Sequence, residues 1–113
     1  MLDDVTSVTL ATAISALSQQ QRTSADNLAN LETTGYQAQR VSFEDSLRSA
    51  VSSGNPSAAT VSVTSSTDPS GVNGNNVSLN AEMVIEQKNN TQFQLLTTAI
   101  SAKFDLISYA IKV

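Results

Sequence analysis

Two adjacent carboxylates, Glu44 and Asp45, are the residues of this sequence that most resemble a catalytic pair. A general acid and a general base must face one reacting group from different environments. Consecutive residues of a helix point in different directions, and Ser42 with Asp45 three positions later resembles a capping box at a helix start. We therefore expect Glu44 and Asp45 to lie in solvent in the first turn of a helix, without a catalytic role.

A second group of oxygen-bearing side chains is typical in residue type of a calcium site: Asp68, Asn73, Asn75 and Asn76. A helix-loop-helix calcium site requires acidic ligands at alternating positions and a closing Glu, whereas this segment has one carboxylate. The sequence also has no cysteine and no histidine. Thiolate chemistry and the commonest metal ligand are therefore missing, and we find no nucleophile and base pair, no phosphate loop and no metal cluster, so we expect a protein that is not an enzyme and holds no metal or cofactor.

The charge pattern excludes further classes of partner. The 113 residues carry a net charge of −4, and the 6 basic residues are scattered singly, which leaves no stripe that could follow a nucleic acid backbone. Asp3 and Asp4 stand where a secretory signal would have Lys or Arg, and no apolar run reaches the roughly 18 residues of a membrane span. We expect no nucleic acid and no small-molecule substrate, and any export must use a route without a cleaved signal.

The residues from Leu79 to Val113 predict one long helix, since they contain no Gly or Pro and keep a helical apolar period. Ser78 is placed to cap it, and Glu82 in its first turn favours the helix dipole. At 1.5 Å per residue the helix is about 50 Å long, which exceeds what a compact domain of this size can bury. Two apolar stripes run along it: a seam of Leu79, Met83, Phe93, Ile100, Phe104, Ile107 and Ile111 that includes polar Glu86, Asn90 and Thr97, and a second stripe of Leu95, Ala99, Ala102, Leu106, Tyr109 and Val113.

A second helical pattern occupies the N-terminal part of the chain, where apolar residues again recur at steps of four and three. Its other faces carry Ala, Ser, Thr and Gln, which cost little to desolvate and allow helices to approach closely. A surface for a polymer and an ordinary solvated surface are both compatible with this composition. The seam of this helix contains Leu10, Ile14, Leu17 and Leu28, with Gln21 and Ser24 among them.

The middle of the chain predicts shorter elements. Residues 37–51 read as an extended piece and a short helix on the spacing of Phe43, Leu47 and Val51. Ser52 to Asn76 holds both prolines and most of the glycines, so we expect a long loop with at most one short strand around Thr60 to Thr64. The predicted fold class is mainly α, with the two long helices paired as a coiled-coil-like hairpin. Within this one unit the segments are the N-terminal helix and turn at 1–36, the short segment at 37–51, the flexible loop at 52–76 and the C-terminal helix at 77–113.

The turn after the N-terminal helix holds the most distinctive motif, Asn27-Leu28-Ala29-Asn30 followed by Thr33-Thr34-Gly35-Tyr36. Asn27 and Asn30 share one helix face, where their amides can join the last turn to the following chain, and Gly35 permits a positive φ. The motif resembles the N-terminal signature of bacterial flagellar axial proteins, the rod and hook family. Thr34 stands where many members of that family have Pro, which affects only the rigidity of the turn.

Within that family the chain is most similar to proximal rod subunits of the FlgB type. The other short proximal rod subunit, the FlgC type, is the alternative within the family. A small secreted helical-hairpin factor of the WXG type is the alternative from another class, although it requires a Trp and this sequence has none. The closer resemblance is carried by Val77, Leu79, Glu82, Met83, Asn90, Leu96, Lys103, Leu106 and Ile111.

The resemblance implies a structural subunit of the proximal rod, which polymerises through its terminal helices into a hollow helical drive shaft. The implied partners are further copies of the chain, rod subunits of the FlgC and FlgF types, the adaptor FliE, the export gate and the MS ring. The implied location is the basal body, in the periplasm or cell-wall space, after export by the flagellar type III apparatus. The residues expected at the assembly interface are Leu10, Ile14, Leu17, Leu28, Leu79, Met83, Phe93, Leu96, Ile100, Phe104, Leu106, Ile107, Tyr109 and Ile111.

Overall fold

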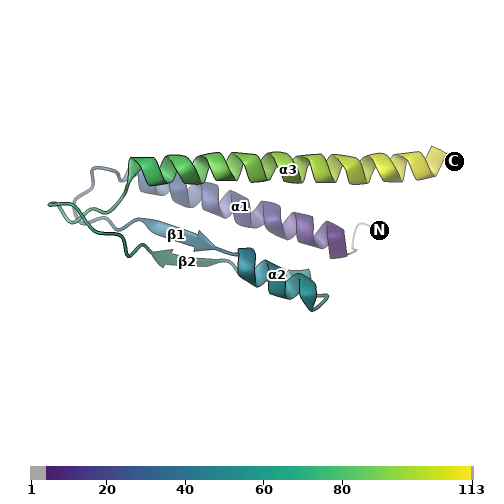
Figure 1. The fold of residues 1–113 in the computed structure, drawn as a ribbon, viewed down its shortest axis with the longest axis horizontal. Helices are drawn as coiled ribbons and strands as arrows, with labels where there is room; N and C mark the ends of the chain where they lie inside the picture. Colours follow the sequence, from purple (N-terminus) through teal and green to yellow (C-terminus); the bar gives the residue numbers. More distant parts are fainter. Residues whose placement is uncertain (1–4, 113) are drawn as a thin grey trace.

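The computed structural model describes residues 5–112 and shows an elongated molecule built on two long helices. Figure 1 shows α1 between α3 on one side and the strands with α2 on the other. The predicted fold class, mainly α with a long helix toward each end of the chain, is confirmed. The elements in order are α1 (Val5–Ala29), β1 (Gln39–Ser42), α2 (Glu44–Ser52), the 3-10 helix η1 (Pro56–Ala58), β2 (Ser62–Ser65) and α3 (Leu79–Lys112).

The two long helices lie side by side in opposite directions, and α3 continues past the first residues of α1 (Figure 1). The molecule is 65 Å long with a radius of gyration of 17.6 Å, against about 13 Å for a compact chain of this length. No described helix is both long and apolar enough to cross a membrane. Asp3, Asp4 and Val113, which entered the sequence predictions, lie outside the described residues.

The contact between α1 and α3 differs from the predicted apolar seam. Asn90 and Thr97 were expected in that seam, but both are exposed, whereas Asn89 is only 1% exposed. Asn89, the residue before Asn90, faces α1 because α3 is rotated to bring the carboxylate of Glu82 against donors on α1 and β1. Phe93, which was also predicted for the seam, does lie partly buried against the core. Polar partners therefore set the rotation of α3 near its start.

The apolar core is small and lies where α2 meets α1. It consists of Ala16, Leu17 and Phe43, with partly buried side chains packed around it from β1, α2 and α3. Phe43 also stands at the N-cap of α2, and no side chain caps that helix, so the predicted capping box of Ser42 is wrong. Ser42 is instead the last residue of β1, so Phe43 and not Ser42 precedes the first residue of α2. The short helix predicted on the spacing of Phe43 is confirmed.

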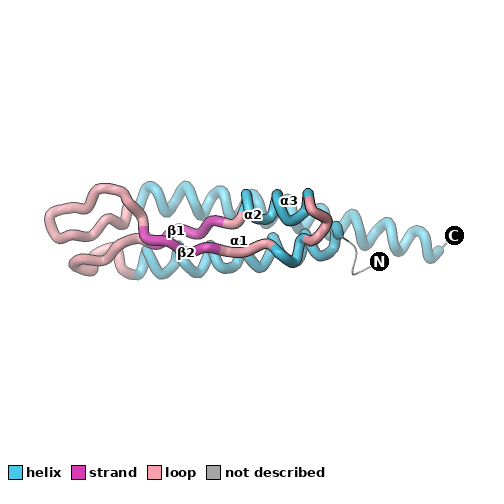
Figure 2. Tube along the Cα trace, turned by 90° about the horizontal axis from the view of Figure 1, so that it is seen from below, coloured by secondary structure: helices cyan, strands magenta, loops and turns pink. Residues whose placement is uncertain are grey.

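The segment 52–76, predicted as one long loop, contains structure of its own. It holds η1 and the strand β2, which pairs antiparallel with β1 so that Gln39 lies opposite Ser65 and Ser42 opposite Ser62. Figure 2 shows the two strands side by side, flanked by loops. A short strand near this position was expected, but its pairing was not. Local composition cannot show a partner that lies some 20 residues away in the chain, because strand pairing depends on the tertiary fold.

Candidate functional site

A buried carboxylate joins three elements near the start of α3. The side chain of Glu82 is 0% exposed, and its Oε2 accepts a hydrogen bond of 2.8 Å from the Ser24 hydroxyl of α1. Its Oε1 accepts from the Asn27 amide at 3.0 Å and from the Arg40 guanidinium at 2.6 Å. Hydrogen bonds to an ionised group are stronger than those between neutral groups. Glu82 therefore holds the first turns of α3 against α1 and β1.

The side chain of Asn27 is 1% exposed and makes three hydrogen bonds. The backbone N–H of Gln39 donates to its Oδ1 at 2.9 Å, and its Nδ2 donates to the Gln39 carbonyl at 2.9 Å as well as to Glu82. The prediction that this amide joins the helix end to the following chain is confirmed. Asn30 acts more locally, since its amide donates to the Asp26 carbonyl and its Oδ1 accepts from the Thr33 hydroxyl.

Two glycines meet where the turn after α1 approaches the loop before α3. Gly35 has the predicted positive φ, +76°, and its N–H donates to the Asn73 carbonyl at 2.9 Å. Gly74 has a φ of +79°, and a Cβ there would lie 3.4 Å from the Cα of Gly35. Both backbones therefore need the left-handed region, and Gly74 also needs the space.

Two consecutive asparagines complete this junction, and sequence reasoning missed their role. The Asn75 amide donates to the carbonyls of Asn30 and Thr33 at 2.8 and 2.7 Å, and the Oδ1 of Asn76 accepts from the N–H of Ala38 at 2.6 Å. Considered from the sequence only as calcium ligands, they instead satisfy backbone groups of the turn after α1. The described residues hold no cluster of three or more possible metal ligands.

The contacts of Glu82 were also missed, because the physical role predicted for it was with the helix dipole. Its three donors lie 42 to 58 positions away in the chain, where no local pattern can reveal them. One signal was present: Glu82 lies seven residues before Asn89, so both polar side chains occupy one face of α3. Both prove to be buried against α1, and Asn89 donates to the Leu17 carbonyl at 3.2 Å.

The residues predicted for assembly fall into three sets. Leu17 is 1% exposed and lies in the chain's own core, with Phe93 and Leu96 packed against it, so Leu17 is not available to a neighbouring molecule. Others are half-buried: Leu28 on α1, and Leu10, Ile14, Ile100 and Ile107 where α1 and α3 meet. The third set is exposed by 49% to 79% and lies along α3: Leu79, Met83, Phe104, Leu106, Tyr109 and Ile111.

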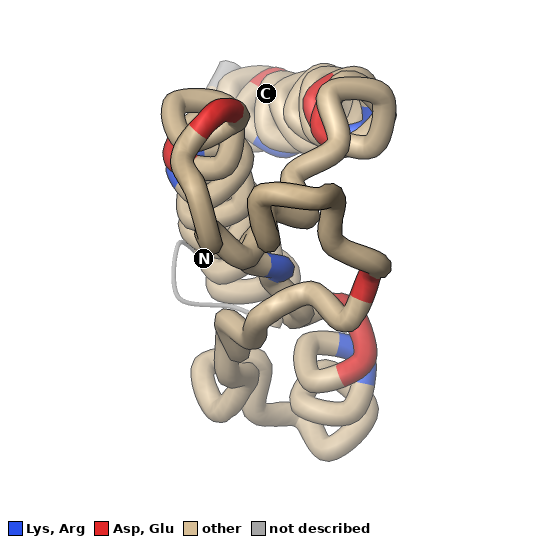
Figure 3. The backbone as a smooth tube through the Cα atoms, turned by 90° about the vertical axis from the view of Figure 1, so that its left-hand side faces the viewer, with Lys and Arg blue, Asp and Glu red and all other residues tan. Residues whose placement is uncertain are grey.

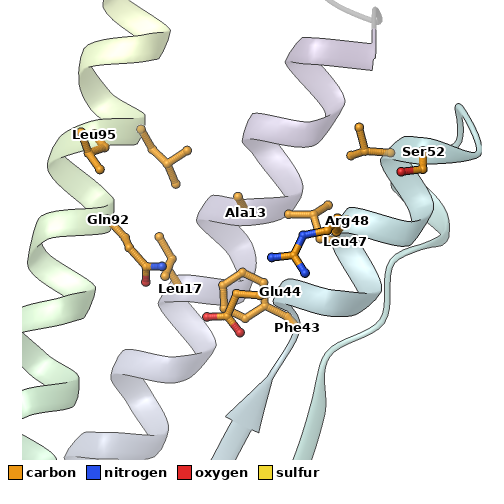
Figure 4. A pocket seen from close by; sticks show the side chains of 11 residues that line it. Ala13, Leu17, Phe43, Glu44, Leu47, Arg48, Ser52, Gln92 and Leu95 are labelled. Atoms are coloured by element: carbon orange, nitrogen blue, oxygen red, sulfur yellow. The ribbon is translucent and has the colours of Figure 1, made fainter.

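Two apolar grooves open along the helix pair. The first, of about 450 Å³, lies between α1, α2 and α3; Figure 4 shows Leu17 from α1, Phe43 and Leu47 beside α2, and Leu95 from α3 around it. The second, which we call the terminal groove, has a volume of about 370 Å³ and lies between the first turns of α1 and the last turns of α3. Its lining is Ser7, Leu10, Ala11, Ile14, Ile100, Lys103, Phe104 and Ile107.

Charged residues are few around these surfaces. Figure 3 shows acidic and basic positions scattered over the backbone rather than gathered on one face. The ion pairs near the first groove, Glu44 with Lys88 at 3.6 Å and Asp45 with Arg48 at 2.8 Å, lie at the surface, where such pairs contribute little. The grooves are therefore suited to burying another apolar helical surface.

A comparison with known protein families gives a match in the N-terminal part of the chain. Residues 9–37 match the protein family described as flagella basal body rod protein. This range covers most of α1 and the turn with Asn27, Asn30 and Gly35, and it does not extend over α3. A comparison with curated protein sequences gives no match.

Proposed function

The chain belongs to the flagellar basal body rod proteins, and from that premise we propose that it is a proximal rod subunit of the FlgB type that polymerises through its two terminal helices. Family membership, first indicated by the motif from Asn27 to Tyr36, is confirmed and gives the chain a structural role in the basal body. The type of subunit and its polymerisation belong to the proposal.

The observation that carries this proposal is the apolar surface left uncovered on α3. Leu106 is 71% exposed, Tyr109 73% and Ile111 79%, all on the part of the helix with least cover from the rest of the chain. The accessible surface is 7221 Å², against about 5,900 Å² for a compact protein of this mass. Leu106 and Tyr109 share one side of α3, and an exposed apolar surface of this kind is typical of a protein interface. Burial between subunits would remove it from water.

The FlgB type is favoured over the FlgC type by the residues around the start of α3. Glu82 and Met83 are among the residues that carry the resemblance to the FlgB type. In the structure the carboxylate of Glu82 binds α1 and β1, which explains an acidic residue at this position. We propose further rod subunits, the adaptor FliE, the export gate and the MS ring as neighbours. Export by the flagellar type III apparatus into the periplasm or cell-wall space is part of the same proposal. Complementation of strains that lack one proximal rod subunit each distinguishes the two types.

A charge on the exposed face of α3 tests the proposal. Leu106→Asp places a carboxylate in solvent in the single chain, so the circular dichroism spectrum of the purified variant should equal that of the parent. In a polymer the same carboxylate would be buried without a partner in every repeat, at a cost of several kcal/mol each. We expect cells with this variant as the only copy to form no rods and to lose motility.

Leu106→Met is the matched control, because it changes the shape of the side chain but keeps it apolar. It should leave rods visible in micrographs of isolated basal bodies and should preserve motility. Motile cells carrying Leu106→Asp would show that this face of α3 is not buried in the assembled rod, and would contradict the proposal.

A further inference from the structure

Two surfaces of the helix pair, one on α3 and the other the terminal groove, are complementary to each other. We propose that an apolar ridge on α3, formed by Ala99, Ala102, Leu106 and Tyr109, lies in the terminal groove of a second copy of this chain. The inference rests on the proposed function, since it specifies which surfaces of the subunit meet in the polymer. The occupant of the groove is a parallel second copy at the same height along the long axis of the molecule.

The ridge and the terminal groove occupy different sides of α3. Residues two apart in a helix point about 200° apart. Phe104 lines the groove, and the ridge residues Ala102 and Leu106 stand two positions before and after it. In the same way Ile107 lines the groove and Tyr109 stands two positions later. A chain can therefore offer its ridge to one neighbour and its groove to another.

The two surfaces also lie at the same level along the long axis. The groove takes its α3 side chains from Ile100 to Phe104 and Ile107, and the ridge runs from Ala99 to Tyr109. A copy placed beside the first one without an axial shift brings its ridge to the groove. Because the contact is head-to-tail rather than two-fold, each addition leaves one ridge and one groove free, and growth continues until the rotation between copies closes a ring.

The chemistry of the two surfaces matches. The ridge presents two large exposed side chains, Leu106 and Tyr109, and two alanines that allow a neighbouring helix to approach closely. The groove is lined mainly by aliphatic and aromatic side chains.

The uncovered area has the size that such a contact requires. The accessible surface exceeds that of a compact chain of this mass by roughly 1,300 Å². A standard interface removes about 800 Å² from each partner, and in a head-to-tail assembly each chain contributes two such surfaces. The excess is thus comparable to one ridge and one groove per chain.

Introduced cysteines test the contact directly, because the natural chain has none. Ala11→Cys places a thiol in the groove and Ala102→Cys places one on the ridge, and both positions are exposed. In basal bodies from cells with the double variant as the only copy, oxidation should produce a ladder of covalent dimers, trimers and larger species that collapses on reduction. Each single variant should remain monomeric.

Ser108→Cys combined with Ala11→Cys is the matched control. Ser108 is exposed and lies two residues after Leu106, so it points away from the ridge. This pair should give no ladder under the same oxidation. If the Ala11→Cys/Ala102→Cys chain fails to assemble, the two single variants are produced together in one strain, each with a tag of different mass. The expected product of oxidation is then a dimer that contains one chain of each kind.

The outcomes separate this inference from the proposed function. A dimer from Ala102→Cys alone would mean that ridge packs on ridge in a closed pair, and would overturn the inference. Motile cells whose rods give no cross-link between positions 11 and 102 would also overturn it, while leaving the proposed function intact. If the unmodified chain itself builds no rods in a strain lacking its native gene, the proposed function fails as well.

Discussion

At the scale of single residues, one carboxylate determines how α3 sits on the rest of the chain. Glu82 is fully buried and accepts three hydrogen bonds from α1 and β1. Only Arg40 among its donors is charged, and the side chain of Arg40 keeps a relative exposure of 27%. The pair is therefore partly screened by solvent, and most of its value lies in the geometry that it imposes.

Glu82→Gln should lower the free energy of unfolding by about 1–3 kcal/mol, because it removes the ionised acceptor of these hydrogen bonds while keeping the size of the side chain. Urea denaturation of the purified chain, followed by circular dichroism, measures the loss. Glu86→Gln is the control on the next turn, where Glu86 is half-buried and has no ion pair among the described residues. Equal losses for both variants would contradict the role given to Glu82.

The site residues that were predicted from the sequence have partners nearby in the chain. The residues that were missed have partners far away in the chain. Asn27 and Gly35 belong to a compact motif, and Asn27 bonds Gln39 only 12 positions later, so local reasoning found them. The three donors to Glu82 lie 42 or more positions away, and Asn76 accepts a hydrogen bond from Ala38, which lies 38 positions away. Such pairs depend on the tertiary fold, which composition and periodicity do not specify.

At the scale of elements, the turn after α1 depends on a left-handed residue. Gly35→Ala should cost about 1 kcal/mol of unfolding free energy, since an L side chain disfavours the φ of +76° although no atom obstructs the added Cβ. Gly35→Asn should cost less, because Asn tolerates this region better than other residues. The same urea denaturation provides the measurement. An alanine variant as stable as the parent would show that the turn relaxes to another conformation.

The elements themselves were predictable to different degrees. The long helices follow from apolar periodicity without Gly or Pro, and α3 has nearly the bounds that were predicted for it. The rotation of α3 about its axis was not predictable. Leu79 and Met83 predicted an apolar seam against α1, but both are exposed and the structure buries Glu82 instead. The strand β2 was expected near its observed position, but its pairing with β1 required the three-dimensional structure.

At the scale of the whole molecule, an elongated shape goes together with a large exposed apolar surface on α3. A chain 65 Å long with a core of three buried residues leaves much of α3 uncovered. Hydrophobic burial is the main favourable term in association, so this surface would supply the driving force for the proposed polymerisation. The proposed rod places it between subunits, and the ridge and the terminal groove specify how.

The most direct test of this account is the reactivity of one thiol on α3 before and after assembly. Leu106→Cys in the otherwise cysteine-free chain is labelled with a maleimide, first in the purified chain and then in isolated basal bodies. The account predicts rapid labelling of the purified chain and labelling at least about tenfold slower in the rod, because burial in the polymer shields the thiol. Equal rates in both states would contradict the claim that the apolar face of α3 is covered by polymerisation.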